Sequence, residues 1–593
     1  MYTANDVIER PLDVVQQCME AHADKANWNV SEVFERALDG QMDKIPSLLS
    51  QRFEDVKENT LVHFRGMVQD SSDPEYYQKC VMRRGPDGST SKVATKYVDA
   101  LPACPEGFSF EFQSGNNDID QRIPLYVVAV PGQAEWAADA VRSGGGDRDG
   151  QKGGVREEGE EGDAVRNSKR ERSEEGAVPA LAPSSTAHCD EVDGQGGKKA
   201  RVDEAKVASR HGEVYDSKRA EALAQIQKGK ACIVKIYSDS ESGWKLNGVC
   251  DFFGVVSFDV VDPSTSDAHV EEDVGLAPRM EPPASIVPRL HCIAWKEVNT
   301  LYPIRYTTPI DQSHLAVARE NALSCMKAIT GDSLAAEYLL MCLISRVTER
   351  LASLTLGKLA LNFSGLHRNF NHAGFISLLS HFVPNMKVIN LSVKYLNESA
   401  FVPKKDYDIQ RLLHGELQLP AGTVIVVNEL TMDEGVLQES GIRNLGHLKK
   451  LMQSQSLDYD FQYYSAPFET DCPVIILSEG QSMIGSDARV AVGGNSNFGC
   501  AEGVSEEMVQ GARHYLCACR STSALLEEAA MAHVEESIVQ LRQSAEGATE
   551  LQLHYLMGLA RLQAITWGRQ GVEKADWDRA LALDRERHLK MAQ

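Results

Sequence analysis

Apolar residues recur at helical spacing at the start of the chain, and from position 61 the repeat changes to every second residue. The helical spacing predicts short helices within an N-terminal segment, 1–54. The alternation that follows predicts a β-rich segment over 55–136. Its expected strands are 61–70, 108–112 and 125–132, and a Pro-Asp-Gly turn is expected within 83–89.

The composition changes between 137 and 228. This stretch is rich in Gly, Ser and charged residues and has few large apolar ones, most clearly at 143–154 and 157–163. Such a segment cannot bury enough apolar area to offset the entropy of ordering its chain. We therefore expect a disordered linker over 137–228.

A second β-rich segment is expected over 229–300, with strands at 231–237, 246–261 and 289–298. Both β-rich segments carry glycine inside a strand, at Gly66 and Gly254, which permits the sharp bending of a small closed barrel such as an OB-fold. A sandwich would produce a similar pattern. Whether the two segments form one barrel or two stays open.

Strands and helices alternate over 301–504, which predicts an α/β domain with a mostly parallel sheet covered on both faces. The expected helices are 331–347, 372–383, 408–417 and 444–455, and the expected strands are 358–365, 387–393, 423–429 and 472–480. The remaining segment, 505–593, is predicted to form three or four helices. The fold class is therefore α/β and multidomain.

Length, charge and cysteine content narrow the functional class. A chain of 593 residues has room for about three to five domains. Its formal net charge of −24 opposes DNA binding by the whole surface, although a local basic patch stays open, and favours basic protein surfaces as partners. The chain has thirteen cysteines but no C-x-x-C pair, and it shows neither an apolar leader at the N-terminus nor a long apolar stretch. We therefore expect a soluble intracellular protein without a membrane partner.

Six sequence strings resemble those of a known family in order and spacing along almost the whole chain. They are RGMVQDSSDPEYY, VPRLHCIAWKEV, GDSLAAEYLL, VPKKDYDIQRLLHGELQLP, LDYDFQYY and PVIILSEGQSM. Through these strings the chain resembles the minichromosome maintenance complex-binding proteins. The resemblance implies a nuclear, non-catalytic partner of the replicative helicase subunits. It also implies a role in their assembly, stability or unloading during DNA replication, and in sister-chromatid cohesion.

Under this resemblance, 301–504 looks like a degenerate P-loop ATPase domain of the AAA+ type. A phosphate-binding loop needs flexible glycines, a lysine for the terminal phosphates and a Ser or Thr for magnesium. The loop 364–374 has neither a Gly-Lys pair nor a hydroxyl residue after it, and the nearest such pair, Gly357-Lys358, precedes the strand. This loop is not expected to hold a triphosphate.

Other positions of the expected nucleotide site are also substituted. Asn428 stands where an Asp would hold magnesium, although Glu429 remains, and Ser478 with Glu479 stands where a phosphate sensor is expected. The helices of 505–593 are similar to the helicase's ATPase lid, but Leu551 replaces the Arg that would reach the nucleotide. We therefore predict a pseudo-ATPase with no catalytic, cofactor or metal residues and no small-molecule substrate.

Two binding hypotheses remain. In the first, the chain mimics a helicase subunit and occupies a neighbouring subunit's interface without hydrolysing ATP. In the second, an OB-like barrel binds single-stranded nucleic acid through aromatic and basic side chains, which would give a weak association with chromatin or DNA. The candidates for this groove are Phe64, Arg65, Tyr76, Tyr77, Lys79, Arg83, Arg84, Trp244 and Lys245.

Two short basic clusters in the linker match the form of a nuclear import signal. They consist of Lys169, Arg170, Arg172, Lys198, Lys199 and Arg201. An ordinary charge-balanced linker would contain similar clusters, and the family resemblance favours nuclear import. We therefore expect the nucleus as the location.

Overall fold

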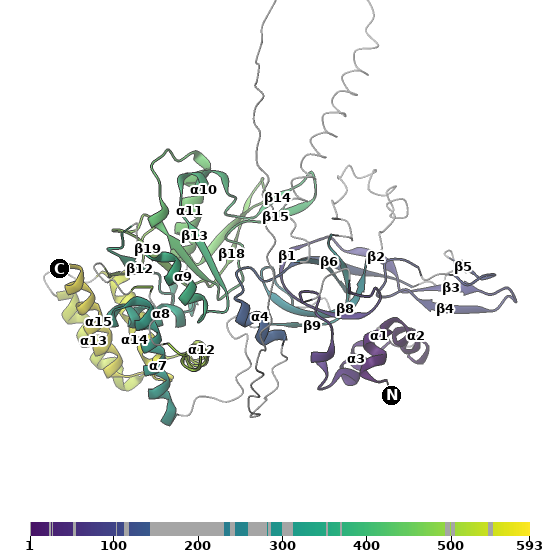
Figure 1. The fold of residues 1–593 in the computed structure, drawn as a ribbon, viewed down its shortest axis with the longest axis horizontal. Coiled ribbons are helices and arrows are strands. Elements are labelled where there is room, and N and C mark those ends of the chain that lie inside the picture. The colour runs from purple at the N-terminus through teal and green to yellow at the C-terminus, as the bar shows by residue number, and fades with distance from the viewer. Residues whose placement is uncertain are drawn as a thin grey trace, which may run out of the picture. The chain divides into compact units, whose positions relative to one another are not determined.

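The computed structural model describes residues 2–142 and 230–592 apart from internal gaps. The gaps of four or more residues within and between these ranges are 51–54, 112–117, 143–229, 238–242, 259–281, 299–311, 493–497, 500–503 and 544–548. The described chain is mixed α/β, as expected, with several separate sheets (Figure 1). None of its described helices is long and apolar enough to cross a membrane.

Three helices open the chain, as the spacing predicted. They are α1 (Ala4–Glu9), α2 (Pro11–Ala21) and α3 (Val30–Leu38). Thr3 and Asp6 form a capping box at the start of α1, which satisfies backbone N–H groups that the first turn leaves without partners. The buried faces of these helices share a core with residues of the β-rich region, including Tyr97 and Tyr237.

Strands from both β-rich segments form one closed six-stranded sheet, which answers the question that the sequence left open. Its strands are β1 (Leu61–Ser71), β2 (Glu75–Gln78), β6 (Ile119–Val128), β7 (Ala231–Tyr237), β8 (Val249–Ser257) and β9 (Arg289–Glu297). The order is β1-β8-β9-β7-β6-β2, and the sheet closes because β1 also pairs with β6. The predicted turn joins β3 (Cys80–Arg84) to β4 (Thr90–Ala94), which with β5 (Ser109–Glu111) make a separate sheet. That the barrel is OB-like stays a prediction.

Two glycines allow strands of this barrel to approach closely. A Cβ atom on Gly66 would lie 2.6 Å from the carbonyl oxygen of Val128, and one on Gly254 would overlap the carbonyl of His291. Gly66 lies where β1 passes from pairing with β8 to pairing with β6, and Gly254 lies at an irregularity in the pairing of β8 with β9. The sequence signal that suggested a barrel therefore has a steric cause.

Charged side chains are buried at one side of the barrel around Asp99, which is 1% exposed. Its carboxylate lies 2.8 Å from the ammonium of Lys235, 2.6 Å from the guanidinium of Arg122 and 3.4 Å from Nε2 of His291. Burial alone would raise the pKa of Asp99, but the neighbouring His291, Lys235 and Arg122 lower it well below its ordinary value. Tyr237 completes the group, with its hydroxyl 2.8 Å from Nδ1 of His291.

The α/β region is built on a five-stranded parallel sheet. Its strands are β12 (Leu361–Ser364), β13 (Met386–Asn390), β16 (Val424–Asn428), β19 (Val474–Leu477) and β20 (Ala488–Ala491). The order is β13-β16-β19-β12-β20, so the first strand along the chain lies inside the sheet. Strand β20 was not predicted, because Arg489 interrupts its apolar run, whereas β12 and β19 are buried along their whole length.

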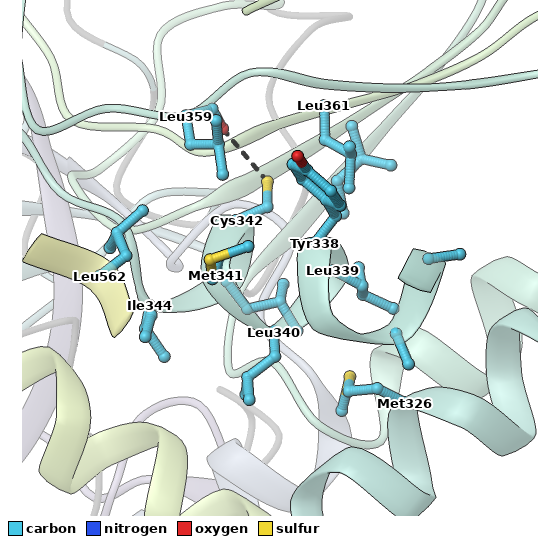
Figure 2. Packing of buried hydrophobic residues seen from close by; sticks show 14 of the residues in the cluster. Met326, Tyr338, Leu339, Leu340, Met341, Cys342, Ile344, Leu359, Leu361 and Leu562 are labelled. Carbon is cyan, nitrogen blue, oxygen red and sulfur yellow. Dashed lines mark hydrogen bonds between the residues drawn. The ribbon is translucent and has the colours of Figure 1, made fainter. Parts of the chain in front are cut away.

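Alternate residues of these strands enter two different cores. Leu477 belongs to the core shared with α7 (Gln312–Thr330), α8 (Ser333–Ile344) and α9 (His372–Ser380), whereas Ile476 belongs to the core shared with α10 (Val393–Glu398) and α11 (Glu439–Ser454). Helix α8 is buried almost all round. Figure 2 shows its side chains between Leu562 of α14 and Leu359 and Leu361, which lie just before and at the start of β12. The thiol of Cys342 in this helix donates to the carbonyl of Leu359.

Four helices follow the sheet, in agreement with the prediction of three or four. They are α12 (Glu506–Ser521), α13 (Glu528–Gln543), α14 (Glu550–Thr566) and α15 (Lys574–Ala592). Their buried faces belong to the same core as α7 and α8. The range 505–593 is therefore part of the core of the α/β region and not an appended layer.

One predicted helix is wrong. The range 408–417 contains a turn and strand β15 (Arg411–Leu413), which pairs with β14 (Lys404–Asp406). Its apolar residues have helical spacing, but Gln410 adopts a positive φ of 53° in the turn. Leu412 enters the core from β15, and Leu417 enters it from the turn that follows. A second hairpin, β17 (Ser456–Asp460) and β18 (Ser465–Glu469), joins them in one sheet and was not predicted.

The boundary of the predicted linker also needs correction. A disordered linker was predicted over 137–228, but helix α4 (Glu135–Arg142) includes the first six of these residues. The remaining residues of the predicted linker, 143–228, lie outside the described residues. The indole of Trp136 donates to the carbonyl of Ser380 at 2.9 Å, and Arg513 lies 4.0 Å from its ring centre. These contacts fix the start of α4 against the α/β region.

Candidate functional site

The carboxyl ends of the parallel strands are where a ligand is expected in an open α/β sheet, beside the strand at which the order reverses. That strand is β12, which lies between β19 and β20. The polar residues at this edge come from the ends of the strands and the loops behind them. They are Asn362, Ser364, Asn390, Asn428, Glu429, Ser478, Ser482 and Arg489.

The loop after β12 uses its own backbone donors. The N–H of Gly365 donates to the carbonyl of Glu479 at 3.0 Å, and the N–H of Leu366 donates to the carbonyl of Ser478 at 3.2 Å. A phosphate-binding loop turns such N–H groups toward the ligand. Here the loop behind β19 already occupies them.

Apolar side chains anchor the remainder of this loop. Leu366 is buried, and the ring of Phe370 packs on Phe498 with a centre-to-centre distance of 4.6 Å. Phe375, in the first turns of α9, also stacks on Phe498, with the ring centres 5.0 Å apart. The side chain of Asn371 accepts from the N–H of Gly374 and so caps α9. In a phosphate-binding loop this helix start would serve the ligand, whereas here aromatic packing and the cap stabilise it.

The two residues at the end of β16 are engaged within the protein. The amide of Asn428 donates to Oδ1 of Asn390 at 3.0 Å, and its own Oδ1 accepts from the N–H of Leu430. Oε1 of Glu429 accepts from the hydroxyl of Ser482 at 2.7 Å and from the N–H of Met483 at 3.2 Å. Burial raises the pKa of Glu429. Oε1 of Glu429 therefore ties the end of β16 to the loop behind β19.

Ser478, at the expected phosphate-sensor position, also forms its hydrogen bonds within the protein. The hydroxyl of Ser478 lies 2.8 Å from Oδ1 of Asn362 and 2.8 Å from the carbonyl of Gly480. Arg489, a cation at this edge, donates through Nε to the hydroxyl of Ser364 at 3.0 Å. Among the described residues, no group of three or more His, Cys, Asp or Glu is placed to hold a metal ion.

Helix α14 has one buried face and one exposed position that bear on the lid resemblance. Leu553, Leu556, Leu559 and Leu562 of α14 are buried in the large core of the α/β region. Leu551, which stands where the resemblance expects an arginine, lies in the first turn of α14 and is 69% exposed. At this position the chain therefore presents an exposed apolar side chain where the resemblance expects a cation.

The candidate nucleic-acid groove on the barrel does not assemble. Phe64 is buried in the barrel core, and Tyr77 contacts Tyr237 edge-on. Three of the basic residues lie against acids: Arg65 binds both oxygens of Asp251, Lys79 lies 3.2 Å from Asp120, and Arg84 lies 3.1 Å from Glu111. Arg83 lies over the ring of Phe108. Tyr76 and Lys245 are exposed, and Trp244 packs beside the barrel core. This distribution lacks the row of free cations that a phosphate backbone requires.

The import-signal candidates Lys169, Arg170, Arg172, Lys198, Lys199 and Arg201 all lie outside the described residues, and they stay a prediction. The structure also presents residues that the sequence analysis passed over. Tyr463 and Tyr464 are exposed in the turn between β17 and β18. The string LDYDFQYY carried the family resemblance, but without the hairpin nothing distinguished its exposed rings from core aromatics.

The chain is a mixed α/β protein that combines a closed β-barrel with a parallel sheet. At the carboxyl ends of the parallel strands, where a ligand would be expected, the loops form hydrogen bonds with one another. The profile of the mini-chromosome maintenance replisome factor family matches residues 34–591. The chain therefore belongs to this family, which confirms the resemblance drawn from its motifs.

Relatives from plants and animals match the chain over most of their length. The mini-chromosome maintenance complex-binding protein of Arabidopsis thaliana is 30% identical over 580 residues, covering 95% of this chain and 94% of the relative. The protein of the same name from Danio rerio is 28% identical, with 98% and 97% covered. The one from Homo sapiens is 27% identical, with 100% and 99% covered.

Proposed function

We propose that this chain is a non-catalytic binding partner of the mini-chromosome maintenance helicase subunits. The observation that carries the proposal is the near-complete coverage of relatives that are named as binding proteins of this complex. The chain acts in the assembly, stability or unloading of the complex during DNA replication and thereby supports sister-chromatid cohesion. Purified helicase subunits should be retained by the immobilised full chain, and failure to retain any of them would refute the proposal.

The binding mode that we propose is subunit mimicry by a pseudo-ATPase. A parallel sheet with its first strand in the interior, followed by helices that share its core, supports a common origin with the helicase's own AAA+ domain. The loops at Gly365 and Glu429 are held by other loops, which supports loss of nucleotide binding. A mimic without a nucleotide site can hold a subunit at a shared surface but cannot cycle with ATP.

We expect no specific ATP hydrolysis and no affinity for Mg²⁺–ATP tighter than about millimolar, because the loop after β12 has no lysine and the N–H groups of Gly365 and Leu366 already donate to carbonyls of another loop. Isothermal titration calorimetry of the full chain with Mg²⁺–ATP, together with a phosphate-release assay, measures both quantities. The matched variant is Glu429→Gln, which keeps the shape of the side chain. Turnover in the wild type that disappears in this variant would contradict the pseudo-ATPase proposal.

We further propose that the chain acts in the nucleus and that the two basic clusters direct its import. Replacing Lys169, Arg170, Arg172, Lys198, Lys199 and Arg201 by Ala should move a fluorescently tagged chain to the cytoplasm. The thermal unfolding midpoint should not change, since the described core contains none of these residues. Unchanged nuclear accumulation would show that another signal or a bound partner carries the chain into the nucleus.

A further inference from the structure

The closed barrel is built from two portions of the chain that the segment 143–229 separates in sequence. We call residues 2–142 the N-terminal portion and residues 230–592 the C-terminal portion. The N-terminal portion provides β1, β2 and β6, and the C-terminal portion provides β7, β8 and β9. Because the barrel has the order β1-β8-β9-β7-β6-β2, the two portions meet along two seams, β1 with β8 and β6 with β7. Neither portion alone can therefore close the barrel.

Each seam is a ladder of paired antiparallel strands with apolar side chains behind it. Residues 61–67 of β1 pair with β8, and residues 122–128 of β6 pair with β7. The barrel core contains side chains from both portions, including Phe64 from the N-terminal one and Phe252 from the C-terminal one. Separating the portions would expose this core to water and leave an edge of β1, β6, β7 and β8 without a partner strand.

Buried charges also pair across the two seams. The carboxylate of Asp99, in the N-terminal portion, lies 2.8 Å from the ammonium of Lys235 and 3.4 Å from Nε2 of His291, both in the C-terminal portion. Across the other seam, Asp251 accepts from Nε and from Nη2 of Arg65, each at 2.6 Å. A buried charge that loses its partner is strongly destabilising, so these pairs make each portion specific for the other.

The end of the N-terminal portion is also bound to the α/β region. The N–H of Met386 donates to the carbonyl of Gly132 at 2.8 Å, and the N–H of Ala134 donates to the carbonyl of Pro384 at 2.8 Å. The chain before α4 therefore runs antiparallel beside the start of β13, which is an edge strand of the parallel sheet. The indole bond from Trp136 to α9 follows two residues further along. The C-terminal portion thus holds the N-terminal one at the barrel and at the sheet.

We infer that the N-terminal and C-terminal portions bind one another without their covalent connection, so that the C-terminal portion is a specific binding site for the N-terminal one. A cut within 143–229 would break none of the contacts described above, because all of them lie outside this segment. A covalent connection raises the effective concentration of the two portions but adds no contact of its own. A protease that cuts the segment should therefore leave an assembled protein of two chains. The inference goes beyond the proposed function and does not depend on it.

The test uses the full chain with an affinity tag at its N-terminus and a recognition sequence for a site-specific protease inserted after Gly153. The tagged chain is bound to resin, cut to completion and washed in native buffer, and the release of the C-terminal fragment is followed over time. We expect this fragment to stay on the resin through hours of washing. Concentrated urea should release it at once, which shows that the cut is complete.

Two variants weaken contacts between the portions, and a matched control does not. Asp99→Ala removes the partner of Lys235, and Trp136→Ala removes the bond to α9, so each should speed release from the cut chain by at least about tenfold. Circular dichroism of the uncut variants comes first. If Asp99→Ala unfolds the barrel, Trp136→Ala decides the test. Glu111→Ala breaks an ion pair with Arg84 inside the N-terminal portion and should release at the wild-type rate.

Two outcomes would overturn the inference. The first is loss of the C-terminal fragment from the cut wild type as fast as the wash removes an unbound protein. The second is the same release rate for the wild type and for the folded variants that weaken contacts between the portions, because the fragment would then be held by something other than these contacts.

Discussion

A chain truncated after Ala548 is expected to lose the cooperative folding of its α/β region. The truncation removes α14 and α15, which contribute Leu559, Trp577 and Leu583 to the core that also holds α7, α8 and the parallel sheet. Each Å² of apolar surface returned to water destabilises the fold by about 25 cal/mol, whereas the free energy of unfolding of a domain is only about 5–15 kcal/mol. The near-ultraviolet circular dichroism of the core tyrosines that the truncated chain keeps, Tyr338 and Tyr515, should collapse, and subunit capture should be lost with it.

Single substitutions in α14 provide a matched form of this prediction. Leu559→Ala should lower the free energy of unfolding by about 2–5 kcal/mol, because Leu559 is 1% exposed and its loss leaves a cavity. Leu551→Ala, on the same helix at 69% exposure, should change it by less than about 0.5 kcal/mol. Urea titrations of both variants measure the difference. Equal effects would mean that α14 does not pack as described.

Asp99→Ala should destabilise the barrel by about 3–5 kcal/mol. The substitution leaves the ammonium of Lys235 and the guanidinium of Arg122 buried without the carboxylate that lies 2.8 Å and 2.6 Å from them. Glu75 is a second acid near both cations, but it is about one-third exposed and cannot take the position of Asp99. The midpoint of urea unfolding should therefore move to a much lower concentration.

An exposed ion pair on the same β-rich part serves as the control. Glu111→Ala removes the partner of Arg84, which is mostly in solvent, and should cost less than about 1 kcal/mol.

The stabilisation that the Asp99 carboxylate gives the folded state should also depend on pH. Because its pKa is lowered in the folded state, its stabilisation is complete above the unfolded pKa of about 3.9 and declines as the pH falls below it. A difference between wild type and Asp99→Ala that grew on acidification would contradict this account.

The sequence predicted the elements whose apolar period is long and uniform. The strand at 231–237 has the bounds of β7, and the helix at 331–347 contains α8, because both are buried runs with clear ends. It failed at 408–417, where Ile409, Leu412 and Leu417 have helical spacing but reach the core from a hairpin and a loop. Tertiary contacts decide such short segments, and no local pattern records them.

The joining of the two β-rich segments also depended on contacts that the sequence does not display. Strands β6 and β1 of the first β-rich segment pair with β7 and β8 of the second segment, respectively. At the candidate nucleotide site, the missing lysine and the Asn428 substitution were evident from residue types alone. The bonds that hold the loops, such as Gly365 to Glu479, required the structure, because they are made by the backbone.

The central claim is that the folded body of the chain, and not the segment between its β-rich parts, binds the helicase subunits. Purified subunits should be titrated against the immobilised full chain and against a chain lacking about Ser143–Arg210, after circular dichroism has shown that the two have the same fold. We expect nearly equal affinities, because the proposed surfaces lie on described residues outside the deletion. Loss of subunit binding by the correctly folded deletion variant would place the binding site in the deleted segment and contradict subunit mimicry.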